Sequence, residues 1–480
     1  MRATWRLVVV REAVPMGPAD ARLAFNSATP LLTLPVELIG RVLDHPLLGE
    51  TVNFIASMIR DLRRVDESAQ FVEFQELLLS RTLQVGTQRA SLARDGSRRR
   101  GGRSVSKMSE AALAGDPDDP DAWALAEYTH ARSLRQLRAL GDGLAWRAFG
   151  YERAIIAALS ANRSPGPVVK KIHADGDLDV GLRNEIEQIR VAWRDCGIFL
   201  LHHDLTDCLR VGDATAFHPD GQRELHEFKT GDRKPKSVQR ARLKQALEAI
   251  NEGAPLPGGT MAVSRVGVAY TTDIPALSDA VHYARTRFCQ GCKLPEGRAI
   301  VAISLIGSQR PSDIGAAMAL WTRERSGALK RAGIGVAEHH LRMTSFDIAG
   351  RSPLVPPWAI YPLEPDECAG MICDLIAFES VVSGLAILRS LEREGLRTEL
   401  RLPDGNSTLD PKTAILRTTN GRNELSVYPN GLSPMMLELL RPSTWAAGTS
   451  ELLRSQPRAP QAHPLFLDDD RHWMPRLHAA

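Results

Sequence analysis

The stretch that decides the fold reads VGDATAF at residues 211–217, HPDG at 218–221 and ELHEFKTG at 224–231. Two β-like runs, 208–217 and 224–229, flank a Pro-Asp-Gly turn, and this pattern predicts an antiparallel hairpin. Because side chains alternate between the two faces of a strand, Glu227 and Lys229 are expected on the same face. The turn folds the first strand back beside the second, which brings Asp213 close to that pair.

Two carboxylates and an ammonium group on one patch of sheet favour a metal site. Neighbouring carboxylates repel each other unless they share a divalent cation, and Mg²⁺ is typically held by one or two carboxylates together with phosphate oxygens and water. We therefore expect Asp213 and Glu227 to bind Mg²⁺ or Mn²⁺. Lys229 would orient the attacking water or neutralise charge on the phosphate. The alternatives are an ordinary salt-bridged hairpin, another kind of metal site, or a degenerate form of the same fold.

The segments around the hairpin predict an α/β core. Helical periodicity runs over residues 182–193 before it and 237–251 after it, and a strand is expected at 265–271. A helix at 274–288 and an apolar strand at 299–306 extend this core. Farther along, we expect a long helix near 368–394 and a hairpin of residues 414–419 and 424–428 around Asn420-Gly421.

At these residues the chain resembles the PD-(D/E)XK nuclease superfamily, over about residues 180–272. Asp213 matches the lone aspartate of its signature, Glu227-Phe228-Lys229 matches the Glu-x-Lys, and 237–251 matches the following helix. The resemblance implies a restriction-endonuclease-like mixed-sheet core and metal-dependent cleavage of phosphodiester bonds. It also implies an acidic residue from the preceding helix, for which Glu185 is the better candidate and Glu187 the alternative.

The helix after the hairpin carries further candidates. Branches of the superfamily that resemble bacterial exonucleases have a Gln early in this helix, and Gln239 fits, although Leu243 stands where their aromatic residue would be. At 100° per residue, Gln239 shares the core-facing side with Leu243, Ala246 and Ile250, and it would reach toward the strands. Residues 229–244 hold a local charge of +6, which predicts a nucleic-acid-binding surface. Its cations besides Lys229 are Arg233, Lys234, Lys236, Arg240, Arg242 and Lys244.

The flanks divide the rest of the chain. We expect a helical N-terminal region at 1–93, a linker at 94–121 and a helical region at 122–165 with a possible break at Gly141-Asp142-Gly143. The linker reading rests on the basic, Gly/Ser-rich residues 94–107 and on the proline-broken acidic residues 116–121. The nuclease-like core would then occupy 166–308, and a mixed α+β C-terminal region would occupy 309–480.

Composition limits the class of protein. The 480 residues carry 60 Lys+Arg against 57 Asp+Glu, a net charge of only +3, and 43% of them are apolar. This balance excludes a mainly disordered chain and a general polyanion-coating protein. Six cysteines make no disulfide framework, and no apolar run is long enough for a signal peptide or a membrane span. We expect a cytoplasmic protein with reduced cysteines.

Two weaker motifs remain. Cys289-Gln290-Gly291-Cys292 and the wider pair Cys368 and Cys373 have the residue types of a metal site, but we interpret them as reduced and partly buried thiols. His202-His203-Asp204 offers a ligand or a general base, and we interpret it as structural or solvated.

The functional prediction is a metal-dependent nuclease. The resemblance implies a nucleic-acid partner, with DNA favoured over RNA, and a setting in DNA repair or in defence against phage. The N- or C-terminal region would select substrate or bind a protein partner, and no membrane partner is expected. The alternative is a non-catalytic nucleic-acid-binding or scaffold subunit that retains the nuclease fold. A third hypothesis is a metal-dependent enzyme acting on a non-nucleic phosphate ester.

Overall fold

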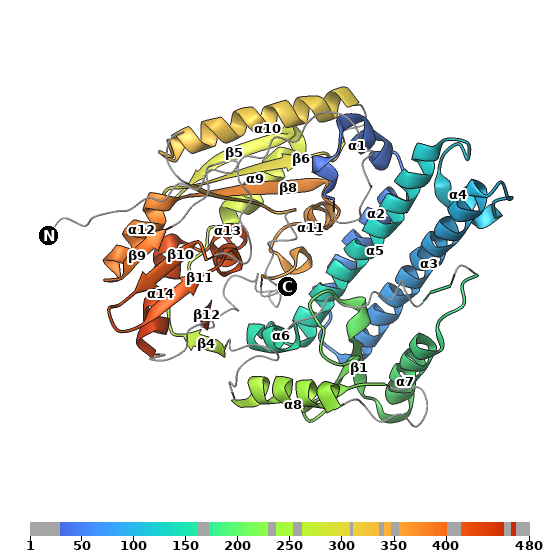
Figure 1. Ribbon diagram of the computed structural model, residues 1–480, viewed down its shortest axis with the longest axis horizontal. Helices are drawn as coiled ribbons and strands as arrows, with labels where there is room; N and C mark the ends of the chain where they lie inside the picture. Colours follow the sequence, from blue (N-terminus) through green and yellow to red (C-terminus); the bar gives the residue numbers. More distant parts are fainter. Residues whose placement is uncertain are drawn as a thin grey trace.

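Figure 1 shows the computed structural model of the chain, which has a mixed α/β fold. The structure describes residues 29–160, 172–173, 175–228, 237–252, 262–307, 311–335, 340–346, 355–400, 414–455 and 462–466. Its strands form two three-stranded sheets, one four-stranded sheet and one two-stranded sheet. The α/β class predicted from the sequence is therefore confirmed.

Six helices build the N-terminal part of the described chain. They are α1 (Val36–Leu43), α2 (Pro46–Leu62), α3 (Ser68–Arg100), α4 (Lys107–Leu113), α5 (Pro120–Ala148) and α6 (Arg153–Ser160). The two longest, α3 and α5, pack side by side along much of their length (Figure 1).

The reading of residues 94–107 as a linker without a core is wrong over its first half. Residues 94–100 are the last turns of α3, and the basic residues there lie on its flank while Asp95 is fully buried. Asp95 Oδ2 accepts hydrogen bonds from the backbone amide of Ser106 (2.8 Å) and the hydroxyl of Ser109 (2.9 Å). Burial opposes the charge on Asp95, but these bonds and one from Arg94 lower its pKa to about 2.

Helix α5 runs without a break through Gly141-Asp142-Gly143. The glycines serve close packing instead of a turn, because a Cβ on Gly141 would lie 1.9 Å from the carbonyl oxygen of Leu205. A Cβ on Gly143 would lie 2.7 Å from the Cβ of Ala359, in the C-terminal half of the chain. Two segments far apart in the sequence thus approach the backbone of one helix within a single turn.

The predicted hairpin belongs to a small antiparallel sheet of order β1-β2-β3. Its elements in chain order are α7 (Val180–Cys196), β1 (Phe199–His202), β2 (Ala214–Phe217), β3 (Arg223–His226) and α8 (Ser237–Glu252). These bounds confirm the helix, strand pair and helix expected from the sequence. Ile189 of α7 packs with Leu200, Ala214 and Ala216 on one face of the sheet, while Phe199 and Phe217 belong to the main core.

The strand expected at 265–271 is displaced and pairs elsewhere. Strand β4 covers Ala262–Val266 and runs parallel to β12 (Ala462–Phe466). The sheet of β1, β2 and β3 is antiparallel throughout. Among the described residues, the mixed sheet expected for a restriction-endonuclease-like core is therefore not found as one sheet.

A second layered unit follows in the chain. It contains α9 (Ile274–Arg287), β5 (Cys289–Leu294), β6 (Arg298–Ser304), α10 (Pro311–Arg331), β7 (His340–Thr344) and β8 (Ile376–Ser383). The sheet is antiparallel with order β5-β6-β8-β7, and α10 covers the face that carries Cys289, Ala299 and Val301 (Figure 1). The helix and strand predicted at 274–288 and 299–306 correspond to α9 and β6.

The single long helix expected near 368–394 is wrong. The chain forms α11 (Pro365–Ile372), then β8, then α12 (Gly384–Arg393). Every residue of β8 is buried, so neither face is solvated and the sequence pattern does not separate strand from helix. Asp374, at φ +57°, ends the first helix.

The remaining elements complete the C-terminal part. They are β9 (Arg397–Leu400), β10 (Leu416–Thr419), β11 (Glu424–Val427), α13 (Ser433–Leu437) and α14 (Pro442–Ser455). Strands β10 and β11 form the hairpin predicted around Asn420-Gly421.

One hydrophobic cluster runs through most of these elements, from Leu31 in the first turn to Leu453 in α14. The division into regions predicted from the sequence stays a prediction. Within the described residues, none of the helices combines the length and the apolar character that a membrane crossing requires.

Candidate metal centre

Polar side chains gather at one end of the β1-β2-β3 sheet. His202 ends β1, and the register places it opposite Ala214 at the start of β2, which in turn lies opposite His226 at the end of β3. The residues just beyond these positions share the same sheet edge. They are His203 and Asp204 after β1, Asp213 before β2, and Glu227 after β3.

Asp213 is held between both neighbouring strands. Its backbone amide donates to the carbonyl of His226 (2.8 Å), and its own carbonyl accepts from the amide of His203 (2.9 Å). Its carboxylate Oδ2 accepts from the amide of Phe228 (2.7 Å), which places that oxygen beside the backbone that carries Glu227. The hairpin therefore brings Asp213 next to the Glu227 segment, as the turn predicts.

A second group of ligand-type side chains lies at the same end. Glu185 comes from α7, His202 from β1, and Asp204 from the short 3₁₀ turn His203–Leu205. One potential ligand atom from each lies within 4.8 Å of the other two. His202 Nε2 is 3.4 Å from Glu185 Oε2, and both side chains are buried.

This trio fits a divalent cation. Oxygen ligands bind Mg²⁺ at about 2.1 Å, so two atoms that share one ion lie at most about 4.2 Å apart. A closure of a few tenths of an ångström would bring the trio into that range. His202 is only 1% exposed, and its Nδ1 finds no hydrogen-bond partner among the described residues. An imidazole beside carboxylates suits Mn²⁺ and other transition metals better than Mg²⁺.

Helix α3 braces the outer edge of β1. Gln75 is buried, its Nε2 donates to the carbonyl of Leu200 (2.9 Å), and its Oε1 accepts from the amide of His202 (2.8 Å). The side-chain amide thus satisfies the edge of β1 as a neighbouring strand would. This pair of bonds fixes the backbone from which His202 projects.

His203 links β1 to the start of β2. Burial lowers its pKa to about 4, so the ring is neutral near pH 7. Nδ1 lies 3.2 Å from the carbonyl of Gly212, which can only accept, and therefore Nδ1 carries the proton. Nε2 then accepts from the hydroxyl of Thr215 at 2.7 Å. The neutral ring holds the Gly212 turn, where φ is +78°, in front of Asp213.

Helix α5 supports the connection between β1 and β2 from below. Asp142 Oδ1 accepts from the amides of Asp207 (2.6 Å) and Cys208 (2.8 Å). Arg138 forms an ion pair with Asp207 (2.9 Å). Burial, reinforced by the charge of Asp207, raises the pKa of Asp142 to about 6. The loop that carries Asp204 is therefore tied to a long, rigid helix.

Several predicted site residues lie outside the described part of the chain. These are Lys229, Arg233, Lys234 and Lys236. Gln239 and Arg240 lie in the first turn of α8.

The rest of α8 agrees with the predicted core-facing stripe. Ala246 is fully buried, and Leu243 reaches to within 3.4 Å of the position that a Cβ on Gly212 would occupy. Lys244 is exposed and pairs with Glu248 at 3.5 Å. Arg242 is half-buried. Helix α8 thus packs over the turn that carries Asp213.

The structure adds His202 and Asp204 to the site, where the sequence favoured a structural or solvated role. The signal was present in His202-His203-Asp204, but nothing in one sequence shows that Glu185, 17 residues upstream, reaches His202. Glu187, the alternative to Glu185, is instead exposed and lies 3.9 Å from Arg194.

The cysteines are free thiols, as expected. Cys289 and Cys292 belong to opposite faces of β5, because one packs under α10 and the other against the main core. Burial raises the pKa of Cys289 to about 12 and that of Cys292 to about 11. Protonated thiols that diverge in this way do not suit a shared metal.

Comparisons of the chain with protein-family models, with curated proteins and with solved structures found no match.

Proposed function

We propose that the protein is a metal-dependent nuclease whose centre lies at the end of the β1-β2-β3 sheet. The observation that carries the proposal is the convergence of Asp213, the Glu227 segment and the Glu185–His202–Asp204 trio on one sheet edge. Buried carboxylates are costly unless they are paired or hold a metal. Glu185, His202 and Asp204 lie close enough together to share a divalent ion, and Asp213 and Glu227 follow at the same sheet edge, outside that close trio.

The finer fold assignment is part of the same proposal. Elements α7, β1, β2, β3, α8 and β4 follow one another in the order that the resemblance to PD-(D/E)XK nucleases implies for residues 180–272. The basic segment 229–244 adjoins this edge in sequence and supplies the positive charge that a nucleic-acid backbone requires.

The chain's own residues would divide the work. Asp213 and Glu227, with Glu185, would hold Mg²⁺ or Mn²⁺, and His202 and Asp204 would complete the ligand set. The cation would withdraw charge from the phosphate oxygens and favour ionisation of water. Lys229 would orient the attacking water or offset charge on the phosphate, and Gln239 with Arg242 would contact it. His203 and Gln75 would keep the ligand-bearing backbone in place.

The test is cleavage of labelled DNA and RNA by the full chain. Circular and linear substrates, single- and double-stranded, would be incubated with Mg²⁺, Mn²⁺ or EDTA. We expect cleavage with the metals and none with EDTA. Asp213→Asn should abolish cleavage and retain binding, whereas Asp220→Asn should cut normally. Asp220 is the matched control because it lies in the same hairpin, exposed at the opposite end of the sheet.

The alternatives give different results. A non-catalytic binding subunit would bind the substrates and cut none of them with either metal. An enzyme for small phosphate esters would hydrolyse a small phosphodiester and would not be inhibited by competing duplex DNA.

A further inference from the structure

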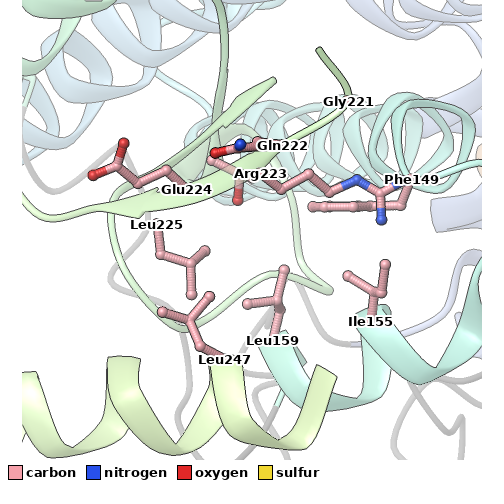
Figure 2. Close-up of a pocket in the computed structure, with 10 residues that line it drawn as sticks. Phe149, Ile155, Leu159, Gly221, Gln222, Arg223, Glu224, Leu225 and Leu247 are labelled. Atoms are coloured by element: carbon pink, nitrogen blue, oxygen red, sulfur yellow. The ribbon is translucent and has the colours of Figure 1, made fainter. Parts of the chain in front are cut away.

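A cavity of about 360 Å³ lies between the β1-β2-β3 sheet and helices α6 and α8 (Figure 2). The apolar part of its lining comes from elements distant in the sequence. It is formed by Phe149, Ile155, Leu159, Leu225 and Leu247. Its size is at the lower end of the range of about 300–1,000 Å³ that is typical of small-molecule sites.

The cavity adjoins the proposed metal centre along the strands. Thr215 and Leu225, which line it, are direct partners across β2 and β3. Asp213 and Glu227 each lie two residues away from them along the chain, just beyond Ala214 and His226, which are the last paired residues of the two strands. Two residues of strand span about 7 Å. A molecule in the cavity therefore lies about two strand residues away from the carboxylates.

Polar residues of β2, of β3 and of the segment that leads into it, including Thr215 and Arg223, complete the lining. Arg223 lies 5.7 Å above the ring of Phe149 and is paired with Glu152 at 3.4 Å. Figure 2 shows Leu225, Leu247 and Leu159 directed toward one another, while the Glu224 carboxylate points away from them. An aromatic ring with branched aliphatic side chains and a guanidinium beside them suits a heteroaromatic ring, which can pack on apolar groups and accept a polar contact.

We propose that this cavity receives one unstacked nucleobase, from the nucleotide next to the phosphate that is cut. The proposal rests on the proposed nuclease function and names its substrate class. A base inside a duplex enters such a pocket only after it has left the stack, which costs free energy. The enzyme therefore acts on single strands or unpaired ends in preference to intact duplex.

The first experiment removes the base. A set of single-stranded oligonucleotides, each with one abasic nucleotide, is cut by the full chain with Mn²⁺. At one position beside the cleaved phosphate, loss of the base should lower kcat/KM about tenfold, a size typical of one base stacked on a protein. Other positions should stay within about twofold.

The second experiment fills the cavity. Leu225→Trp should raise KM for the intact oligonucleotide about tenfold and should add nothing for the oligonucleotide that is abasic at the sensitive position. Leu77→Trp is the matched control, since Leu77 lies in a separate surface groove between α2 and α3. Should Leu225→Trp fail to fold, 2-aminopurine at the sensitive position of the substrate reports directly on the wild type. Its fluorescence should change on binding only at that position.

The outcomes separate the two proposals. The base pocket is wrong if cleavage occurs but no abasic position lowers kcat/KM. It is also wrong if Leu225→Trp raises KM equally for the intact and the abasic oligonucleotide. Either result leaves the nuclease proposal intact. Absence of both cleavage and oligonucleotide binding overturns the nuclease itself, and the base pocket with it.

Discussion

Two buried glutamates of this protein, one in a strand and one in a helix, have different neighbours. Glu379 in β8 lies beneath α10 beside two arginines, with Oε1 2.8 Å from Arg342 Nε and Oε2 3.7 Å from Arg325 Nη1. Glu185 in α7 lies beside His202 and within reach of Asp204. Burial raises the pKa of Glu379, and the two arginines act against that rise.

The difference indicates what each carboxylate is for. The two arginines offset the charge of the Glu379 carboxylate, so this cluster needs no cation to balance it. A cluster of two carboxylates and an imidazole brings three possible metal ligands into one small volume and suits a cation. The neighbours of a buried carboxylate thus help to separate a structural pair from a candidate site.

The largest expected effect comes from a substitution at the candidate metal centre. Asp213→Asn should lower the rate of metal-dependent cleavage by about 10³-fold, equivalent to about 4 kcal/mol, because one ligand and its negative charge are lost. The midpoint of unfolding should move little, since Asn can still accept from the amide of Phe228. Rates under single-turnover conditions measure the effect. A variant that keeps a tenth of the activity would remove Asp213 from the site.

The next largest effect comes from removing the carboxylate of the structural Glu379 cluster. Glu379→Ala should lower the free energy of unfolding by about 3 kcal/mol, because it leaves two arginine charges at the sheet without their partner. Urea titration followed by circular dichroism measures it. The Mn²⁺ affinity of the folded protein should be unchanged. If instead metal affinity falls with Glu379→Ala, the two carboxylate clusters do not have separate roles.

A third prediction concerns a histidine that belongs to neither cluster. Burial lowers the pKa of His130 to about 4, and Nδ1 lies 2.7 Å from the carbonyl of Ala126. The unfolded chain binds a proton near pH 6.5 and the folded chain does not. The contribution of His130 to the free energy of unfolding is therefore fully present above about pH 6.5. It is lost as the pH falls toward 4, by about 3 kcal/mol in total.

Thermal unfolding between pH 7 and pH 4 tests this direction of the pH dependence of stability. His130→Gln should flatten the slope over that range. An unchanged slope in the variant would show that His130 does not titrate as described.

The smallest effect sharpens the metal assignment. His202→Gln should weaken Mn²⁺ binding by about 10- to 100-fold and change Mg²⁺ binding less, because the imidazole favours the transition metal. Titration followed by electron paramagnetic resonance measures Mn²⁺ directly, without any substrate. Equal losses for both metals would mean that His202 acts on the fold and not on the choice of ion.

The sequence predicted the site hairpin well and the buried elements poorly. Helices α7 and α8 and strand β3 are predictable because each has solvated or polar positions, and strand β2 is predictable because the turn at Pro219-Asp220-Gly221 marks the hairpin. Strand β8 was read as helix because both of its faces are buried, which erases the period. The last turns of α3 were read as linker because the buried Asp95 looks like any other charge.

The candidate site was predictable only in part. Asp213 and Glu227 follow from local strand geometry, so their proximity could be derived. The position of His202 beside Glu185 depends on how α7 packs on β1. The His202 backbone is fixed by the hydrogen bond that its amide donates to the side chain of Gln75, 127 residues away. Such contacts carry no periodic signal in a single sequence.

Helix α5 has a mechanical consequence for the site. With glycine at 141 and 143, the segment that leads to Asp207 rests directly on one side of the helix backbone, and Ala359 with its neighbours rests on the other. Because both segments contact the helix backbone and not a side chain that could change rotamer, the helix keeps the distance between them fixed. A shift at Ala359, such as a partner protein could impose on the C-terminal half, passes to the loop of Asp204 almost undiminished. Gly143→Ala should therefore change the Mn²⁺ affinity, although the added Cβ faces away from the metal centre.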